Sequence, residues 1–206
     1  MPSLEKHIYL ASRSARRRDL LKQMGVNFEM LLLREGRGRE ADFDESMLPE
    51  EPPRDYVIRV ARLKAEAGWE RLEQRRLIRH PVLAADTTVA LGNQILAKPV
   101  DREDAVSMLR KLSATTHQVY TSVAVKHHDT FREDLSVTDV QFRALSDDEI
   151  RRYVAGGDPM DKAGGYGIQG KASMFIESIR GSYSGVVGLP IFETTRLLAH
   201  FGFQLL

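Results

Sequence analysis

Segments typical of strands and of helices alternate along most of this chain, but two of the connections between strands are too short to hold a helix. Gly92-Asn93 separates two apolar runs, and His127-His128-Asp129 separates two longer runs in which apolar and polar residues alternate. Short connections join antiparallel strands, whereas a helix between two strands favours parallel neighbours. The sequence therefore predicts a mixed α/β fold, with helices packed on a sheet of parallel and antiparallel strands.

The expected elements follow from hydrophobic periodicity and from the residues that start and stop helices. Strands are expected at 8–11, 28–33, 82–91, 94–97, 118–126, 131–143 and 173–179. Helices are expected at 16–24, 53–76, 101–112, 146–157 and 190–201. Ser14, Asp101 and Ser146 are suited to cap three of them, because short polar side chains accept hydrogen bonds from free backbone N–H groups. Residues 34–54, rich in glycine, proline and charge, are expected to form a functional loop.

Composition narrows the functional classes. A length of 206 residues fits one domain, 1–206, on the usual scale of roughly 100–200 residues per domain. The absence of cysteine excludes a disulfide framework, a Cys-ligated metal site and a thiol nucleophile. No apolar run reaches the ~18 residues of a membrane span, and 30 basic against 29 acidic residues give no broad positive field. We therefore expect a cytoplasmic protein that engages neither a membrane nor a nucleic acid.

The turn at 11–18 contains the kinds of groups that bind an oligophosphate. It lies between an expected strand and an expected helix, and it offers the hydroxyls of Ser12 and Ser14 together with Arg16 and Arg17. Backbone N–H groups and the positive end of the helix dipole add to the attraction for an anion. The alternative is a solvated basic helix face.

Asp86 closes an apolar run at 82–85, where an ionised carboxylate needs a cation, a metal or hydrogen bonds. It could bind Mg²⁺ or take a proton from water, and the alternative is that it caps the following turn. If Leu91 faces Gln94 across a two-residue turn, Lys98 comes close to Asp86. Strict pleating directs the two side chains to opposite faces, so the sequence predicts proximity rather than an ion pair.

Two further segments are candidates for ligand binding. Lys64 continues the apolar helix stripe of residues 57–61, and such a lysine either reaches solvent along the helix or points into a site. The segment 161–170 is rich in glycine, which permits positive φ and a close backbone approach to a ligand. Within it, Gln169 offers both a donor and an acceptor, as the edge of a nucleobase requires.

Taken together, these segments resemble the Maf family of nucleoside triphosphate pyrophosphatases. The resemblance extends from Ile8 to about Leu198, and the blocks follow the family's order. The blocks are Leu10-Ala11-Ser12-x-Ser14-x-Arg16-Arg17, Asp44-Glu45, Tyr56-Val57 through Lys64-Ala65, Ala85-Asp86-Thr87, Lys98-Pro99, Leu112-Ser113 with His117, Asp161-Lys162-Ala163-Gly164, Tyr166-Gly167-Ile168-Gln169-Gly170 and Gly188-Leu189-Pro190. Each block alone is weak evidence for the family, but the occurrence of all of them in the same order along one chain makes the resemblance specific.

The resemblance implies an elongated mixed sheet flanked by helices, with two lobes and a central cleft, usually in a homodimer. It implies hydrolysis between the α and β phosphates of a nucleoside triphosphate, with Mg²⁺, or Mn²⁺ or Co²⁺ in its place, as the divalent metal. The block at 166–170 resembles that of the subgroup acting on dTTP and UTP, with modified pyrimidine nucleotides as further candidate substrates.

The resemblance also implies roles for individual residues. Asp86 aligns with the proton acceptor that activates water, and Glu45 and Asp86 align with positions that place the metal. The positions that select the base are Arg16, Thr87 and Gln169, and those that hold the triphosphate are Ser12, Arg17, Lys64 and Lys98.

The chain departs from the family pattern at Arg13 and Ala114, where the family mostly has glycine, and at Ala15, where it mostly has proline. Arg13 would strain the phosphate turn if its φ were positive. None of these changes removes a group assigned to chemistry. Two alternatives stay open at this point: a pyrophosphatase for another nucleotide such as 7-methyl-GTP, and a nucleotide-binding regulator of cell division. A protein that only binds would not need the base Asp86.

Overall fold

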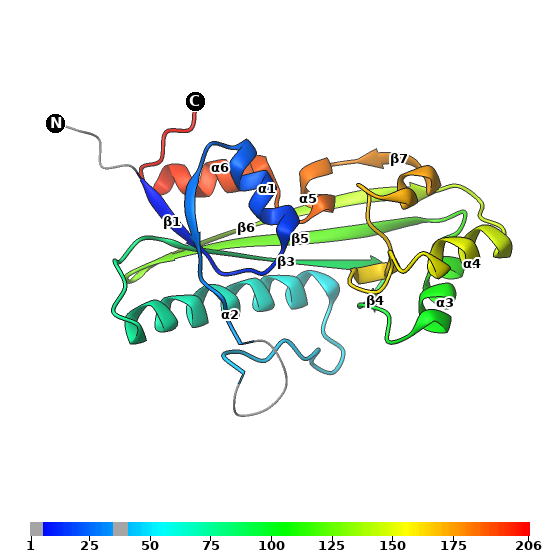
Figure 1. Cartoon of the computed structure of the whole chain (residues 1–206), viewed down its shortest axis with the longest axis horizontal. Coiled ribbons are helices and arrows are strands. Elements are labelled where there is room, and N and C mark those ends of the chain that lie inside the picture. Colours follow the sequence, from blue (N-terminus) through cyan, green and yellow to red (C-terminus); the bar gives the residue numbers. More distant parts are fainter. Residues whose placement is uncertain (1–5, 35–40) are drawn as a thin grey trace.

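A computed structural model describes residues 6–34 and 41–206, so Gly36 and Gly38 of the expected loop lie outside the described residues. The described chain forms a seven-stranded sheet in the order β2-β1-β3-β5-β6-β7, with β4 paired to β3 (Figure 1). The strands are β1 (His7–Leu10), β2 (Asn27–Met30), β3 (Val82–Leu91), β4 (Gln94–Leu96), β5 (Thr116–His127), β6 (Thr130–Phe142) and β7 (Ile176–Arg180).

The sheet is mixed, as the short connections predicted. β1 runs parallel to both β2 and β3, and every other recorded pairing is antiparallel. Leu91 pairs with Gln94, which confirms the expected two-residue turn between β3 and β4. β5 and β6 are the longest strands and pair along their whole length, so they connect the two ends of the molecule.

The helices are α1 (Ala15–Gln23), α2 (Pro53–Gln74), α3 (Arg102–Leu112), α4 (Asp147–Ala155), α5 (Tyr183–Val187) and α6 (Ile191–His200), with the 3-10 segments η1 (Ala163–Gly165) and η2 (Lys171–Phe175). Three of the helices, α1, α3 and α4, begin next to the capping residues that the sequence predicted. Ser14 caps α1, Asp101 caps α3, and Ser146 forms a reciprocal capping box with Glu149 at the start of α4. Each cap satisfies backbone N–H groups that the first turn of a helix leaves free.

Three expectations need correction. The second strand ends at Met30 rather than at residue 33. The last strand begins at Ile176 rather than at 173, because residues 171–175 form the 3-10 turn η2. The helix α5 was not expected at all, since its five residues are too short a run to show helical periodicity.

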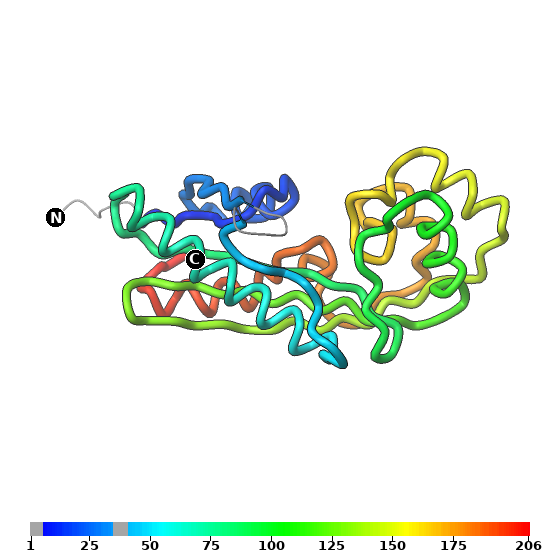
Figure 2. The backbone as a smooth tube through the Cα atoms, turned by 90° about the horizontal axis from the view of Figure 1, so that it is seen from below, coloured from blue at the N-terminus to red at the C-terminus, as the bar shows by residue number. Residues whose placement is uncertain are grey.

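The sheet is long, and different helices cover its two faces and its two ends (Figures 1 and 2). α2 packs on one face, where Ala61 and Ala65 meet Ala84 in one apolar cluster. α6 lies over the other face, in a second cluster that contains Leu83 and Leu198. A third cluster, built on α3, α4 and the far ends of the long strands, forms a separate lobe. The fold is therefore the mixed α/β architecture that the sequence predicted, with the elongated sheet and the two lobes that the family resemblance implies.

No helix in the described ranges combines the length and the apolar character that a membrane crossing requires.

One edge of β3 has a gap in its pairing, and this gap is central to the site. β1 pairs with β3 at Val82 and Leu83, and β4 pairs with it at 89–91, whereas β5 pairs with the opposite edge along 82–90. Within the described ranges, residues 84–88 therefore have no strand beside them on one side. Their side chains alternate between the two faces of the sheet, and Asp86, Thr87 and Thr88 line the cleft along this edge.

Candidate active site

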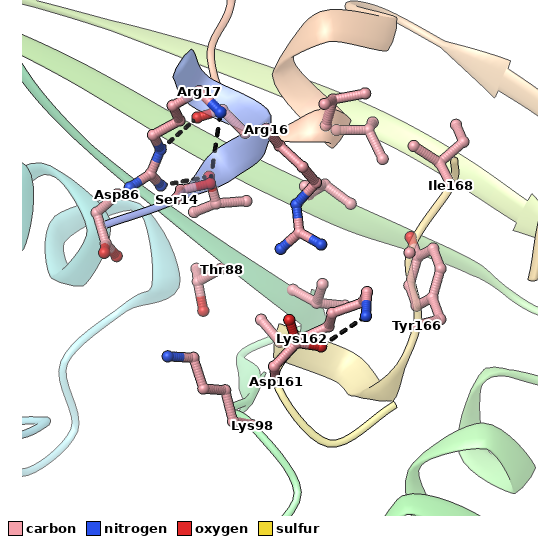
Figure 3. Close-up of a pocket in the computed structure, with 18 of the residues that line it drawn as sticks. Ser14, Arg16, Arg17, Asp86, Thr88, Lys98, Asp161, Lys162, Tyr166 and Ile168 are labelled. Atoms are coloured by element: carbon pink, nitrogen blue, oxygen red, sulfur yellow. Dashed lines mark hydrogen bonds and ion pairs between the residues drawn. The ribbon is translucent and has the colours of Figure 1, made fainter. Parts of the chain in front are cut away.

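A cleft of about 920 Å³ opens along the unpaired edge of β3, between the two lobes (Figure 3). Its walls come from the β1–α1 turn, α2, the loop after β4, the glycine-rich segment and the end of α5. Every site residue that the sequence singled out lines this one cleft: Ser12, Arg16, Arg17, Glu45, Lys64, Asp86, Thr87, Lys98 and Gln169. The structure thus brings together residues that are separated by up to 157 positions in the chain.

Two carboxylates share one ammonium group at the deep end of the cleft. Lys64 Nζ lies 2.7 Å from Asp86 Oδ1 and 3.3 Å from Glu45 Oε2. The Asp86 side chain is 13% exposed and that of Lys64 is 12% exposed, so water screens their attraction only weakly. Lys64 thus points into the cleft and does not run along the helix to solvent.

Tyr56 of α2 supports this group from the side. Its hydroxyl donates to the backbone oxygen of Glu45 at 3.2 Å, which ties the loop containing Glu45 to α2. Burial, followed by the negative charges of Asp86 and Glu45, raises the pKa of Tyr56 well above its usual range. The hydroxyl therefore remains protonated and keeps its donor role throughout the physiological pH range.

The β1–α1 turn is held in place by Arg17. Its guanidinium donates to the oxygen of Gly188 at 2.7 Å, to Ser12 Oγ at 3.2 Å and to Thr87 Oγ1 at 3.2 Å. Three different segments are thereby fixed around one cationic group that faces the cleft. Arg17 is accordingly preorganised, so ligand binding costs little of its side-chain entropy.

The departure at Arg13 does not strain this turn. The only non-glycine residues with positive φ in the described part of the chain are Glu50, Arg76, Ala114 and His128. Arg13 therefore has an ordinary backbone, and its Nη2 donates to the oxygen of Leu33 at 2.9 Å. Ala114, in contrast, has a φ of 55°, in the left-handed region where the family's usual glycine would fit without strain.

The opposite wall contains Lys98, Asp161 and Lys162, and Arg16 points across the cleft toward this wall (Figure 3). Lys162 Nζ donates to Asp161 Oδ1 at 2.5 Å and to the oxygen of Asp158 at 2.6 Å. Burial tends to raise the pKa of Asp161, but the hydrogen bond from Lys162 and the charges of Lys162 and Arg16 lower it below its ordinary value. Asp161 is therefore a fixed negative charge that faces Arg16.

The glycines at 161–170 were expected to allow a close approach to a ligand, but Gly164 instead allows close packing against β3. Gly164 has a φ of 69°, and a Cβ there would lie 2.9 Å from Val89 Cγ1. Its N–H donates to the oxygen of Ala97 at 3.1 Å, so the segment is fastened to the β3–β4 hairpin. Further along, the Tyr166 hydroxyl is 2.7 Å from Nε2 of the buried His117. These contacts fix the segment that contains Gln169.

The donor set fits a divalent cation bound together with a phosphate ligand. The described ranges contain no group of three or more His, Asp or Glu residues that could enclose a metal unaided. Mg²⁺, however, is usually held by one or two carboxylates and completes its coordination with water and substrate phosphates. Asp86 and Glu45 converge on one point from two different segments, as such a site requires.

Comparisons with known proteins give a consistent result. The family model described as "Maf-like protein" matches residues 7–201. A protein of Aromatoleum aromaticum named dTTP/UTP pyrophosphatase is 56% identical over 206 residues and is covered, like this chain, over 100% of its length. A protein of Nitrosomonas europaea with the same name is 58% identical over 195 residues, 95% of this chain and 94% of that protein. Among solved structures, the Staphylococcus aureus Ham1 protein matches with a TM-score of 0.43 and 15% identity, over 66% of this chain and 72% of that one.

Proposed function

Because this chain belongs to the Maf family, we propose that it is a nucleoside triphosphate pyrophosphatase that hydrolyses dTTP and UTP to the nucleoside monophosphate and pyrophosphate. Relatives with that name match it at more than half of all positions over nearly full length. The observation that carries the proposal is the Asp86–Lys64–Glu45 group, which lies in the same cleft as the Ser12–Arg17 turn. The whole chain, 1–206, acts as one domain.

Asp86 is the proton acceptor of the reaction. Its carboxylate takes a proton from water, the water oxygen bonds to the α-phosphorus, and the bond from that phosphorus to the bridging oxygen breaks. Pyrophosphate leaves with the electron pair of the broken bond. Lys64 Nζ, at 2.7 Å from Oδ1, orients the Asp86 carboxylate before the reaction.

Ser12, Arg17, Lys64 and Lys98 hold the triphosphate. These residues lie on both sides of the cleft, so their hydrogen bonds and charges can surround the phosphates. A triphosphate has close to four negative charges, and preorganised cations in a partly dry cleft offset more of that charge than water does. Arg17 is particularly suited because the oxygen of Gly188 already fixes its orientation.

Arg16, Thr87 and Gln169 select the base. Arg16 projects into the cleft near Tyr166 and Ile168, which provide an aromatic and an aliphatic surface (Figure 3). Gln169 offers both a donor and an acceptor to the edge of the base. Changing this residue to glutamate removes the donor, and we expect a weaker preference for pyrimidines.

Asp86 and Glu45 also hold the divalent cation, with Mg²⁺ the first choice and Mn²⁺ or Co²⁺ as substitutes. When bound, the ion neutralises phosphate charge and increases the acidity of nearby water. Lys64 contacts both carboxylates and limits their mutual repulsion while no metal is present.

Release of pyrophosphate from a panel of nucleoside triphosphates tests the proposal. The panel contains dTTP, UTP, dCTP, GTP and 7-methyl-GTP, each with Mg²⁺. Asp86→Asn should keep the fold but reduce turnover about 10²–10⁴-fold, because it preserves shape and removes the base. Asp139→Asn is the matched control, since Asp139 bonds to Gln118 on the neighbouring strand and lies outside the cleft lining.

Each outcome of this assay has a definite meaning. Cleavage of dTTP and UTP that Asp86→Asn abolishes would establish the reaction, the substrate group and the need for the Asp86 carboxylate. Cleavage of 7-methyl-GTP in their place would favour the alternative pyrophosphatase. Binding of nucleotides with no turnover would favour a regulator instead, and full activity of Asp86→Asn would contradict the role of that residue.

The assembly and the compartment are also part of the proposal. Family membership supports a homodimer, which light scattering on the purified chain measures directly. A nucleoside triphosphate substrate and a sequence without cysteine are both suited to the cytoplasm.

A further inference from the structure

The loop that contains Glu45 has no regular secondary structure of its own, since residues 41–52 form neither a helix nor a strand. Before Glu45 in the chain, Phe43 is buried in the apolar cluster of α2. After Glu45, the side chains of Met47 and Leu48 are exposed, so apolar packing does not hold the loop on that side. Other contacts must fix the backbone there.

Arg59 of α2 supplies these contacts. Its Nη2 donates to the backbone oxygen of Ser46 at 2.9 Å, and the same guanidinium donates to the two carboxylate oxygens of Glu51 at 2.6 and 2.7 Å. Glu51 Oε2 also accepts from the backbone N–H of Leu48 at 3.1 Å. One side chain of the helix therefore holds both ends of the exposed half of the loop, starting at the residue next to Glu45.

The Arg59–Glu51 pair is suited to a fixed geometry. The Glu51 side chain is 8% exposed, so water screens the attraction only weakly. The hydrogen bonds from Arg59 lower the pKa of Glu51 below its ordinary value, and the pair stays charged at neutral pH. A planar guanidinium can bind both oxygens of one carboxylate and still donate to a carbonyl group, whereas an ammonium group lacks this fork.

We propose that Arg59 is a positioning residue for Glu45, which holds the loop so that the Glu45 carboxylate meets Lys64 and the divalent cation in the cleft. This inference rests on the proposed function, because that function gives Glu45 its role. Arg59 lies outside the cleft lining and acts only through the loop. Groups that orient a metal-binding carboxylate contribute to metal affinity without touching the metal.

The first test measures the loop without metal or nucleotide, by hydrogen–deuterium exchange of the full chain. Arg59→Lys keeps the charge but loses the fork, so the backbone amides of residues 44–51 should exchange faster than in the wild type. The matched control is Arg62→Lys. Arg62 is also on α2 and also donates two hydrogen bonds to one glutamate, but this glutamate is Glu133 of β6 and not part of the loop.

The second test measures the Mg²⁺ concentration that gives half the maximal rate of dTTP hydrolysis. This concentration should increase about tenfold in Arg59→Lys, whereas kcat at saturating Mg²⁺ should stay near that of the wild type. Glu51→Gln, which weakens the same pair from the other side, should have the same effect. In a Glu45→Gln background, adding Arg59→Lys should cause no further increase, because Arg59 acts through Glu45.

Three outcomes would overturn the inference. They are unchanged exchange of residues 44–51 in Arg59→Lys, an equal change in Arg62→Lys, and a tenfold effect of Arg59→Lys that persists in the Glu45→Gln background. If Arg59→Lys fails to fold, Glu51→Gln takes its place in each comparison. A wild-type chain that releases no pyrophosphate from dTTP would instead contradict the proposed function, and the exchange measurement would still decide whether Arg59 holds the loop.

Discussion

At the scale of single residues, the buried histidine behind the glycine-rich segment shows how a titratable group stabilises the site. His117 is 1% exposed, its Nε2 faces the Tyr166 hydroxyl, and its ring packs edge-on against Phe142 and Tyr166. Burial lowers the pKa of His117 to about 4. The ring is therefore neutral at physiological pH, where it is a structural support and not a charge.

This burial predicts a specific loss of stability in acid. The unfolded chain binds a proton at His117 near pH 6.5, whereas the folded chain resists protonation down to about pH 4. The contribution of His117 to the free energy of unfolding is fully present above pH 6.5. It decreases by up to about 3 kcal/mol as the pH falls toward 4. Urea denaturation at pH 7 and 4.5 measures the decrease, which should be smaller in His117→Phe.

The carboxylates also change the stability in this pH range, but they do so equally in the wild type and in His117→Phe. The difference between the two proteins in how far the free energy of unfolding decreases from pH 7 to 4.5 is therefore due to His117. His200→Phe is the control, because it removes a histidine from an exposed position at the end of α6. An equal decrease in the free energy of unfolding for the wild type and His117→Phe would contradict the proposed contribution of His117.

At the scale of elements, the contact between α2 and the sheet leaves no room for a side chain at one position of the helix, Gly68. A Cβ on Gly68 would be 2.7 Å from Val82 Cγ1 and 3.1 Å from Ala11 Cβ. Lys64 is one turn earlier on the same face of α2. The separation of helix and sheet therefore sets how far the Lys64 ammonium reaches toward Asp86.

Gly68→Ala should lower both stability and activity, although alanine is the better helix former. Overpacking costs about 1–3 kcal/mol, against a gain of about 1 kcal/mol from helix propensity. Moving α2 outward should also lengthen the Lys64–Asp86 contact and reduce kcat. Thermal unfolding and steady-state kinetics measure the two effects, with Glu70→Ala at an exposed position of α2 as the control. An active, stabilised Gly68→Ala enzyme would show that α2 is free to shift.

At the scale of the whole molecule, the positively charged side chains that line the cleft come from both lobes. Arg17 and Lys64 come from the lobe built on α1 and α2, and Lys98 follows the β4 strand on the opposite side. The strands β5 and β6 run through both lobes and pair continuously, which holds the two groups of cations at a defined separation.

This arrangement predicts a marked dependence of substrate binding on Lys98 and on salt. Lys98→Ala should raise the KM for dTTP about tenfold, corresponding to about 1.4 kcal/mol of lost binding. The wild-type KM should increase with ionic strength, and the increase should be shallower in the variant because one cation has been removed. Lys171→Ala, at an exposed position outside the cleft lining, is the control. Equal KM values for Lys98→Ala and the wild type would contradict the proposal that Lys98 binds the triphosphate.

The sequence predicted what local chemistry determines and missed what depends on packing. Ser14, Asp101 and Ser146 could be assigned as caps because a cap acts within one turn of its own helix. Lys64 stayed ambiguous, since only the docking of α2 on the sheet decides which way its side chain points. The contact between Thr121 and Thr87 could not be predicted, because it joins residues 34 positions apart and depends on the register of β3 and β5.

The gap beside β3 separates two tasks that adjacent residues perform. Asp86 contacts Lys64 on one face of the strand, and Thr87 contacts Arg17 and Thr121 on the other. The two side chains therefore contact different neighbours, although they are adjacent in the chain and line the same cleft. A substitution in the core beneath Thr87 can shift that residue while the Lys64–Asp86 contact on the other face keeps its geometry.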